Sequence, residues 1–132
     1  MSEKNVAVVR RAIDAFNRHD LDAMVRYAHP DVEVDWSRSR GVEAGIYRGR
    51  EETRRFWSTF YASFDRIVAA PEELIEHGDY VIVRDRTRLW GRDGIEVEAR
   101  NVGLVTVHDG LILQWRLCRD RAEALKAVGL AE

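Results

Sequence analysis

Two glycine-ended turns in the last third of the chain constrain its fold more than any other feature. The turns Arg92-Asp93-Gly94 and His108-Asp109-Gly110 separate three runs of alternating apolar and polar residues, at about 80–90, 95–107 and 111–118. Alternation with a period of two is typical of strands with one buried face. A glycine in the left-handed conformation closes a three-residue hairpin loop. We therefore expect three consecutive antiparallel strands in this region.

The loop length predicts which residues face each other across the strands. A three-residue loop at the first turn places Asp85 opposite Asn101. The same loop form at the second turn places Trp115 opposite Gly103 and Leu117 opposite Asn101. Because side chains alternate along a strand, the two registers together define one inner face, and a slip of one residue would invert it. The residues of this predicted inner face are Val81, Val83, Asp85, Thr87, Leu89, Val97, Ala99, Asn101, Gly103, Val105, Val107, Leu111, Leu113, Trp115 and Leu117.

The rest of the chain predicts helices first and strands later. Apolar residues recur at helical spacing in residues 3–18, and aromatic residues do so in residues 50–63. The other expected elements are helices at about 21–28 and 120–128 and strands at about 31–36 and 65–76. This order predicts an α+β fold with a mostly antiparallel sheet, one face of which is covered by the N-terminal helices. The length of 132 residues suits one domain, which we expect to span residues 1–132.

The stretch HPDVEVDW, residues 29–36, carries three carboxylates within eight residues. As a strand it places Val32, Val34 and Trp36 on one side and the three acids on the other. The apolar side must face the core, so we expect Asp31, Glu33 and Asp35 to face solvent. The acidic cluster is then no catalytic site. The carboxylate that stands among apolar residues is Asp85.

Composition excludes several classes of function. The net charge of −2, with basic and acidic residues intermixed, gives no basis for binding nucleic acid or a membrane surface. Nowhere do 18 consecutive apolar residues occur, and the single cysteine, Cys118, fits a cytoplasmic protein. The four histidines fall in turns or at helix ends, and no metal-binding or nucleotide-binding spacing occurs. We therefore expect no metal and no cofactor.

Several stretches resemble the nuclear transport factor 2-like superfamily, and within it the SnoaL-like polyketide cyclase and ketosteroid isomerase branch. They are NRHDLDAMVRYAHPDVEVDW, YRGREETRRFW, GDYVIVRDR, and HDGLILQW ahead of DRAEALKAVGL, and they cover essentially the whole chain. The resemblance implies a curved, mostly antiparallel sheet that wraps around the N-terminal helices into a cone with an internal pocket. It also implies a homodimer through the convex sheet face, where crossed Arg–Glu pairs would meet. Members of this superfamily include isomerases, cyclases, dehydratases, hydrolases and non-catalytic domains, so the fold does not define the function.

The catalytic residues of known members are mostly absent. The resemblance aligns Ala12, Trp36 and Gly103 with the tyrosine, the general base and the oxyanion-hole aspartate of ketosteroid isomerases. In the limonene-type epoxide hydrolases an Asp–Arg–Asp arrangement acts. Only Asp85 matches it, since Val83 and Leu117 occupy the other two positions. No histidine falls on the inner face, as the scytalone dehydratase type would require.

Asp85 and Asn101 are the catalytic candidates. Burial raises the pKa of a carboxyl group, which suits proton abstraction next to a carbonyl or activation of water, and Asn101 would orient the carboxylate or bind a substrate oxygen. The alternative is a structural aspartate that is hydrogen-bonded to a helix, to Asn101 or to a tyrosine such as Tyr27 or Tyr47. The candidate pocket residues are Trp36, Tyr47, Phe60, Thr87, Gly103, Trp115 and Leu117.

The expected ligand is a hydrophobic, oxygen-bearing small molecule. Three functions stay open at this stage. They are a cofactor-independent isomerase, cyclase or hydrolase centred on Asp85, a binding domain without turnover, and a dimeric scaffold with a filled core.

Overall fold

The computed structural model describes residues 4–39 and 44–130. Residues 40–43 of the expected loop and residue 3 of the first expected helix lie outside this range. The elements in chain order are α1 Lys4–Asn17, α2 Leu21–Arg26, β1 Ala28–Asp35, β2 Ile46–Arg48, α3 Gly49–Ala62, β3 Arg66–His77, β4 Tyr80–Trp90, β5 Glu96–His108, β6 Leu111–Cys118 and α4 Arg121–Ala127. The expected helices and strands all form, with ends shifted by a few residues. The short strand β2 was not expected.

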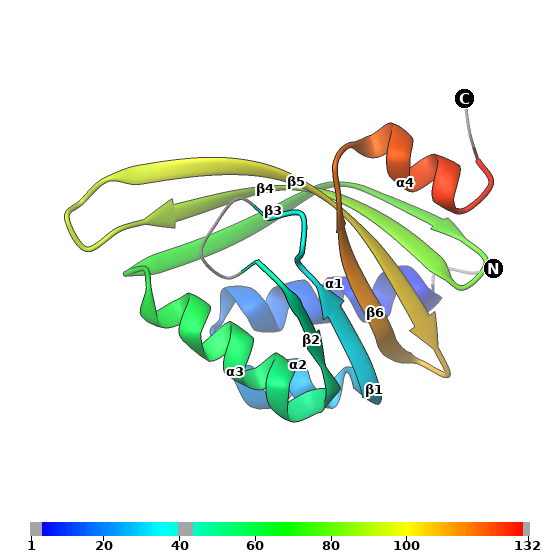
Figure 1. Ribbon diagram of the computed structural model, residues 1–132, viewed down its shortest axis with the longest axis horizontal. Coiled ribbons are helices and arrows are strands. Elements are labelled where there is room, and N and C mark those ends of the chain that lie inside the picture. The colour runs from blue at the N-terminus through cyan, green and yellow to red at the C-terminus, as the bar shows by residue number, and fades with distance from the viewer. Residues whose placement is uncertain (1–3, 40–43, 131–132) are drawn as a thin grey trace.

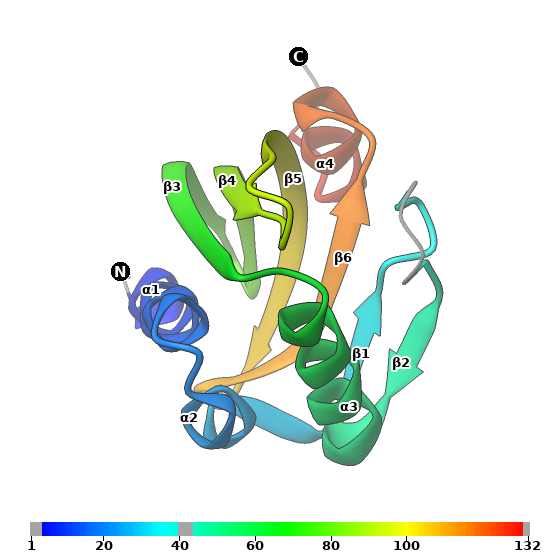
Figure 2. The ribbon, with the colours of Figure 1, turned by 90° about the vertical axis from the view of Figure 1, so that its left-hand side faces the viewer.

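The strands form one curved, six-stranded sheet in the order β2-β1-β6-β5-β4-β3. All neighbours are antiparallel except β1 and β6, which are parallel. Helices α1, α2 and α3 lie on the concave side of the sheet, and α4 packs on its convex side next to β6 (Figures 1 and 2). The predicted α+β fold, a curved sheet around N-terminal helices, is confirmed.

The hairpin of β4 and β5 has the predicted register. The Gly91 N–H donates to the carbonyl oxygen of Ile95 at 2.9 Å, and Gly94 adopts a φ of 83° that closes the loop. Asp85 therefore lies opposite Asn101. The hairpin extends past the helices, so Val97, on the predicted inner face, stays 50% exposed near its tip.

The hairpin of β5 and β6 differs from the predicted one. The loop has two residues, Asp109 and Gly110, which both adopt positive φ, at 52° and 77°. A two-residue loop shifts the pairing by one, and a bulge at Leu113 then shifts it by one more. Trp115 therefore keeps its predicted parity, but it lies opposite Val105 and not opposite Gly103.

The altered pairing moves three other residues of β6. Gly103 pairs with Leu117, so the predicted pairing of Leu117 with Asn101 is wrong. Ile112 takes the buried place expected for Leu111, because it pairs with Val107 and is 6% exposed. Leu111 pairs with His108 at the loop.

Two apolar clusters hold the layers together. On the concave side, Val81, Val83 and Val105 of β4 and β5 share one buried cluster with residues of α1 such as Val9. On the convex side, α4 covers a smaller cluster that contains Cys118. The cysteine therefore lies on the outer face as expected, but α4 buries it to 5% exposure.

The acidic stretch in β1 faces away from the core, as expected. Val32 and Val34 are buried, while Asp31 is exposed. Glu33 accepts hydrogen bonds from Gln114 Nε2 at 2.7 Å and Arg48 Nε at 3.1 Å. These acids therefore belong to the outer side of the sheet.

Candidate functional site

The candidate site is centred on Asp85, in the middle of β4. The Thr87 hydroxyl donates a hydrogen bond to Asp85 Oδ1 at 2.8 Å, and Asn101 Nδ2 donates to the same oxygen at 3.4 Å. Asn101 Nδ2 also lies 3.5 Å from Thr87 Oγ1. These three side chains meet because residues two apart in a strand share a face and Asn101 is the cross-strand partner of Asp85. In the described part of the chain, Asp85 Oδ2 has no hydrogen-bond partner.

The surroundings of Asp85 favour its protonated form. Burial raises the pKa of the Asp85 carboxyl group above its ordinary value, since a buried charge loses its hydration. The hydrogen bonds from Thr87 and Asn101 oppose this effect, and the negative charge of Glu72 adds to it. Glu72 is the extra residue of a bulge in β3 beside Asp85. The net effect is a raised pKa, which makes the carboxylate a stronger base.

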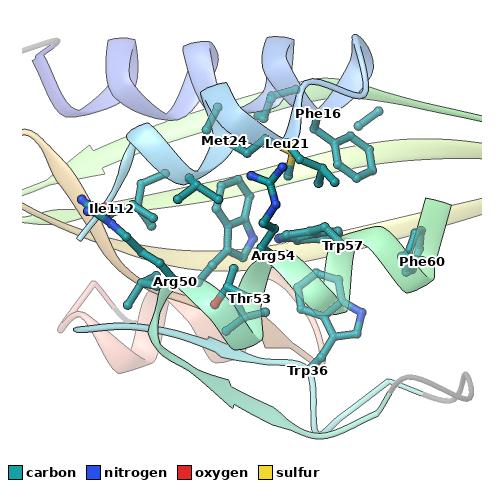
Figure 3. A pocket seen from close by; sticks show the side chains of 18 of the residues that line it. Phe16, Leu21, Met24, Trp36, Arg50, Thr53, Arg54, Trp57, Phe60 and Ile112 are labelled. Carbon is teal, nitrogen blue, oxygen red and sulfur yellow. Dashed lines mark hydrogen bonds between the residues drawn. The ribbon is translucent and has the colours of Figure 1, made fainter. Parts of the chain in front are cut away.

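Asp85 lines a cavity between the concave face of the sheet and the helices. The volume that the centre of a water molecule can reach there is about 120 Å³. One water needs about 10–15 Å³ by this measure, so the space holds several waters or a small organic ring. Side chains from α1, α2, α3 and all strands except β2 line it, and most of them are apolar (Figure 3).

Aromatic side chains form one wall of the cavity. Trp57 of α3 lies at the centre of this wall, with ring centroids 5.3 Å from Phe16, 5.9 Å from Trp36 and 5.7 Å from Phe60. Figure 3 shows Trp36, Trp57 and Phe60 on the same side of the space. Edge-to-face contacts of this kind give a rigid apolar surface on which a ring-shaped ligand can pack.

The cavity brings together most of the candidate residues. Its lining includes Asp85, Asn101, Thr87, Trp36, Phe60 and Trp115. Tyr47, Gly103 and Leu117 do not line it. Tyr47 packs on Phe56 with ring centroids 4.5 Å apart. The Trp115 indole fills the space over Gly103, because a Cβ atom there would lie 2.6 Å from Trp115 Nε1.

Three polar residues of α3 that line the cavity were not foreseen. Arg50, Thr53 and Arg54 share the cavity-facing side of this helix with Trp57 and Phe60. The sequence did carry a signal, since positions 50, 53, 54, 57 and 60 follow helical spacing. The prediction considered only the aromatic residues of this helix and made no assignment for Arg50, Thr53 or Arg54.

The described residues contain no group of three histidine, cysteine, aspartate or glutamate side chains that could hold a metal ion. No helix in the described ranges is long and apolar enough to cross a membrane.

A curved sheet around three helices, with a cavity at its centre, defines the class of NTF2-like proteins. Solved structures with this fold superpose on nearly the whole chain. An NTF2-like protein of unknown function from Burkholderia pseudomallei is 24% identical with a TM-score of 0.80, and the match covers 98% of this chain and 99% of that chain. A family model of the SnoaL-like domain matches residues 9–115. The chain therefore belongs to the SnoaL-like domain family.

Two further solved structures share this fold. A Mycobacterium tuberculosis protein in complex with estradiol-17β-hemisuccinate is 18% identical, with a TM-score of 0.78 and coverage of 89% of this chain and 95% of that one. A putative polyketide cyclase from Sinorhizobium meliloti is 26% identical, with a TM-score of 0.68 and coverage of 85% and 94%. A search of the curated proteins finds no match.

Proposed function

We propose that this protein binds an apolar, oxygen-bearing small molecule in the cavity and that Asp85 performs acid–base chemistry on it without a cofactor. The reaction class is that of an isomerase, cyclase or hydrolase. The observation that carries the proposal is a carboxylate on the wall of an apolar cavity, fixed by hydrogen bonds at one oxygen only.

The geometry of Asp85 suits a general base. Thr87 and Asn101 hold Oδ1, so the carboxylate has a fixed orientation, while Oδ2 is left to take a substrate proton. Burial raises the pKa of Asp85, and a base with a higher pKa accepts a proton more readily. Asn101 would also bind a substrate oxygen next to the reacting carbon, as expected from the sequence.

The related structures support the class of ligand. The M. tuberculosis protein was solved with a steroid ester, and the S. meliloti protein is described as a putative polyketide cyclase. Steroids are ring compounds with a few oxygen atoms, and many polyketides are ring compounds that carry oxygen. A cavity with an aromatic wall and a few polar groups suits molecules of this kind.

A base-sensitive probe tests the proposal without knowledge of the natural substrate. The ring of 5-nitrobenzisoxazole opens when a base removes its ring proton at carbon 3, and the product is coloured. The wild-type protein should open it about 100-fold faster than Asp85→Asn, the low end of what a positioned base contributes. Asp31→Asn, which changes an exposed aspartate of β1, serves as the control and should match the wild type. Equal rates for wild type and Asp85→Asn would refute the catalytic role.

Ligand binding without turnover is the second candidate. The observation that favours it is the hydrogen-bonded network of Asp85, Thr87 and Asn101, which resembles a structural polar cluster. Ala12, Trp36 and Gly103, at the positions that the resemblance assigns to the ketosteroid isomerase residues, also lack ionisable groups. Under this reading the probe quenches tryptophan fluorescence on binding, but no ring opening depends on Asp85.

The assembly and location of the protein form part of this proposal. We expect a cytoplasmic homodimer through the convex sheet face. Arginines of β4 lie beside glutamates of β5 there, with Arg86 3.7 Å from Glu98 and Arg88 3.4 Å from Glu96. In a dimer with two-fold symmetry, the arginines of each copy would pair with the glutamates of the other copy. Sedimentation velocity should then show a dimer that weakens as salt rises, whereas a monomer at low salt would refute this interface.

A further inference from the structure

The cavity has a second polar region, on the first turns of α3. Arg50 and Thr53 are three residues apart on this helix, so their side chains are neighbours on one face. Both line the cavity, and Figure 3 shows them on the cavity side of α3. This region is separate from the cluster around Asp85, which lies on the sheet.

Thr53 carries an unsatisfied hydroxyl group. The residue is 6% exposed, and its Oγ1 atom is buried with no hydrogen-bond partner among residues 4–39 and 44–130. A buried hydroxyl without a partner destabilises the fold, so natural proteins rarely keep one without a reason. Valine has nearly the same shape and would avoid this cost. The hydroxyl therefore points to a polar group that is bound in the cavity.

Arg50 is a cation without an anionic partner. Its Nε and Nη2 atoms donate to one backbone carbonyl, that of Ala28, at 2.9 and 2.7 Å. Within the described residues no carboxylate lies within ion-pair distance of its guanidinium group. Its neighbour Arg54 differs, because Asp22 neutralises it at 2.6 Å. Arg50 thus brings an uncompensated positive charge to the cavity wall.

The two polar regions are well separated along the sheet. Arg50 is bound to Ala28, which pairs with Ile112, and Ile112 pairs with Val107 of β5. Asn101, the partner of Asp85, lies six positions from Val107 on the same strand. Six residues span about 20 Å along a strand. A negatively charged group is therefore attracted to the Arg50 end and repelled from the Asp85 end.

We infer that the ligand carries a carboxylate and that Arg50 and Thr53 form the subsite that holds it. This inference rests on the proposed function, since it specifies the ligand of the same cavity. One carboxylate oxygen accepts from the Arg50 guanidinium group and the other from the Thr53 hydroxyl group. The pairing satisfies both groups and leaves the uncharged part of the ligand in the apolar cavity, on the side toward Asp85. A single charge matches a single unpaired arginine, which favours a carboxylate over a phosphate.

Two probes of nearly the same shape test the inference. Biphenyl-4-carboxylate and biphenyl-4-carboxamide differ in charge, and calorimetry at pH 7.5 measures their affinities. The wild type should bind the carboxylate about tenfold more tightly, as expected for a hydrogen bond to a charged group. Arg50→Gln should remove this preference. Arg55→Gln is the matched control, because Arg55 carries the same charge on α3 but is exposed and pairs with Glu51. It should keep the preference.

Thr53→Val gives an independent reading, because Arg50 also holds the backbone of Ala28 and its loss affects folding. Thr53→Val should weaken carboxylate binding about fivefold. It should also raise the melting temperature, since it removes an unsatisfied hydroxyl. A threonine with no role in binding would show no loss of affinity for the carboxylate.

The outcomes separate the two proposals. Equal affinity of the wild type for both probes would overturn the carboxylate subsite and leave the apolar cavity as a binding site. An unchanged preference in folded Arg50→Gln together with unchanged affinity in Thr53→Val would do the same. If neither probe binds the wild-type protein, the proposed ligand-binding function fails, and the subsite fails with it.

Discussion

Gly103 shows how one missing side chain shapes the cavity. It is buried in β5, and a Cβ atom at this position would lie 2.6 Å from Trp115 Nε1, well inside van der Waals contact. The indole therefore rests directly on the backbone of β5. From this position it lines the cavity without closing it.

Gly103→Ala should consequently destabilise the protein. The added methyl group must displace the indole or separate β5 from β6, and overpacking of this kind costs about 1–3 kcal/mol. Urea unfolding measures the loss. In a Trp115→Phe background the clashing atom is gone, so the same substitution should cost less than half as much. An equal cost in both backgrounds would show that the contact with Trp115 is not the cause.

Asp85→Asn should stabilise the protein at neutral pH. The pKa of Asp85 is raised in the folded state, so the folded protein binds this proton more tightly than the unfolded chain. Stability is then lost as the pH rises from the ordinary aspartate pKa, about 3.9, through the raised value. The substitution removes this loss. The variant should unfold at higher urea concentration than the wild type at pH 7, and the two should converge toward pH 3. A variant that is less stable at pH 7 would show that the charge is compensated.

At the residue scale, strand parity was sufficient to predict the inward position of Asp85. The alternating run and the loop at Gly94 also placed Asn101 opposite to it, as the structure confirms. That Arg50 and Thr53 line the cavity could be predicted only in part, because helical spacing places them on one face with Trp57 but does not show what that face meets. Which helical residues meet a cavity depends on where the sheet curves, and no short-range pattern encodes that curvature.

At the scale of elements, one side chain joins α1 to the edge of the sheet. Asn17 Nδ2 donates to the Ala69 carbonyl oxygen at 2.9 Å, and the Ala69 N–H donates to Asn17 Oδ1 at 2.7 Å. Strand β3 is an edge strand, so these backbone groups lack a neighbouring strand. The asparagine amide replaces that strand at the point where β3 borders the cavity.

Asn17→Ala should therefore cost about 2 kcal/mol, because two partly buried backbone groups lose their partner. Helix propensity acts in the opposite direction, since alanine is the better helix former, so it cannot explain a loss. Asn5→Ala is the control on the same helix. It removes one exposed hydrogen bond, from Asn5 Nδ2 to the Gly78 carbonyl oxygen at 3.2 Å. Chemical denaturation should show a much smaller effect for Asn5. Similar losses for both variants would contradict this role of Asn17.

Turn chemistry predicted one hairpin and not the other. The glycine-ended loop of β4 and β5 has the expected three residues, but the loop after His108 has two, because Asp109 also adopts a positive φ. Aspartate tolerates this conformation, and the sequence alone does not show when it is used. The extra residue of the bulge, Leu113, returns the Trp115 side chain to the predicted inner face. The pairing of β1 with β6 joins segments far apart in the chain and carries no local signal.

At the scale of the whole molecule, a polar site is enclosed by apolar layers. The curved sheet and the three helices on its concave side surround the cavity, and the helix α4 reinforces the convex side (Figure 2). Family resemblance and the order of elements predicted this architecture, because helices followed by consecutive strands can bury their apolar faces in few ways. The acid–base chemistry that we propose depends on one feature of the architecture, which is that it partly withdraws Asp85 from water.

A residue-specific titration of Asp85 tests this claim most directly. The ¹³C chemical shift of its side-chain carboxyl group, assigned by its absence in Asp85→Asn, is followed by NMR from pH 2 to pH 9. We predict a midpoint clearly above the ordinary aspartate value of about 3.9. A midpoint at or below that value would mean that Asp85 is solvated or charge-compensated, and it would contradict both the apolar setting of the site and its proposed role as a base.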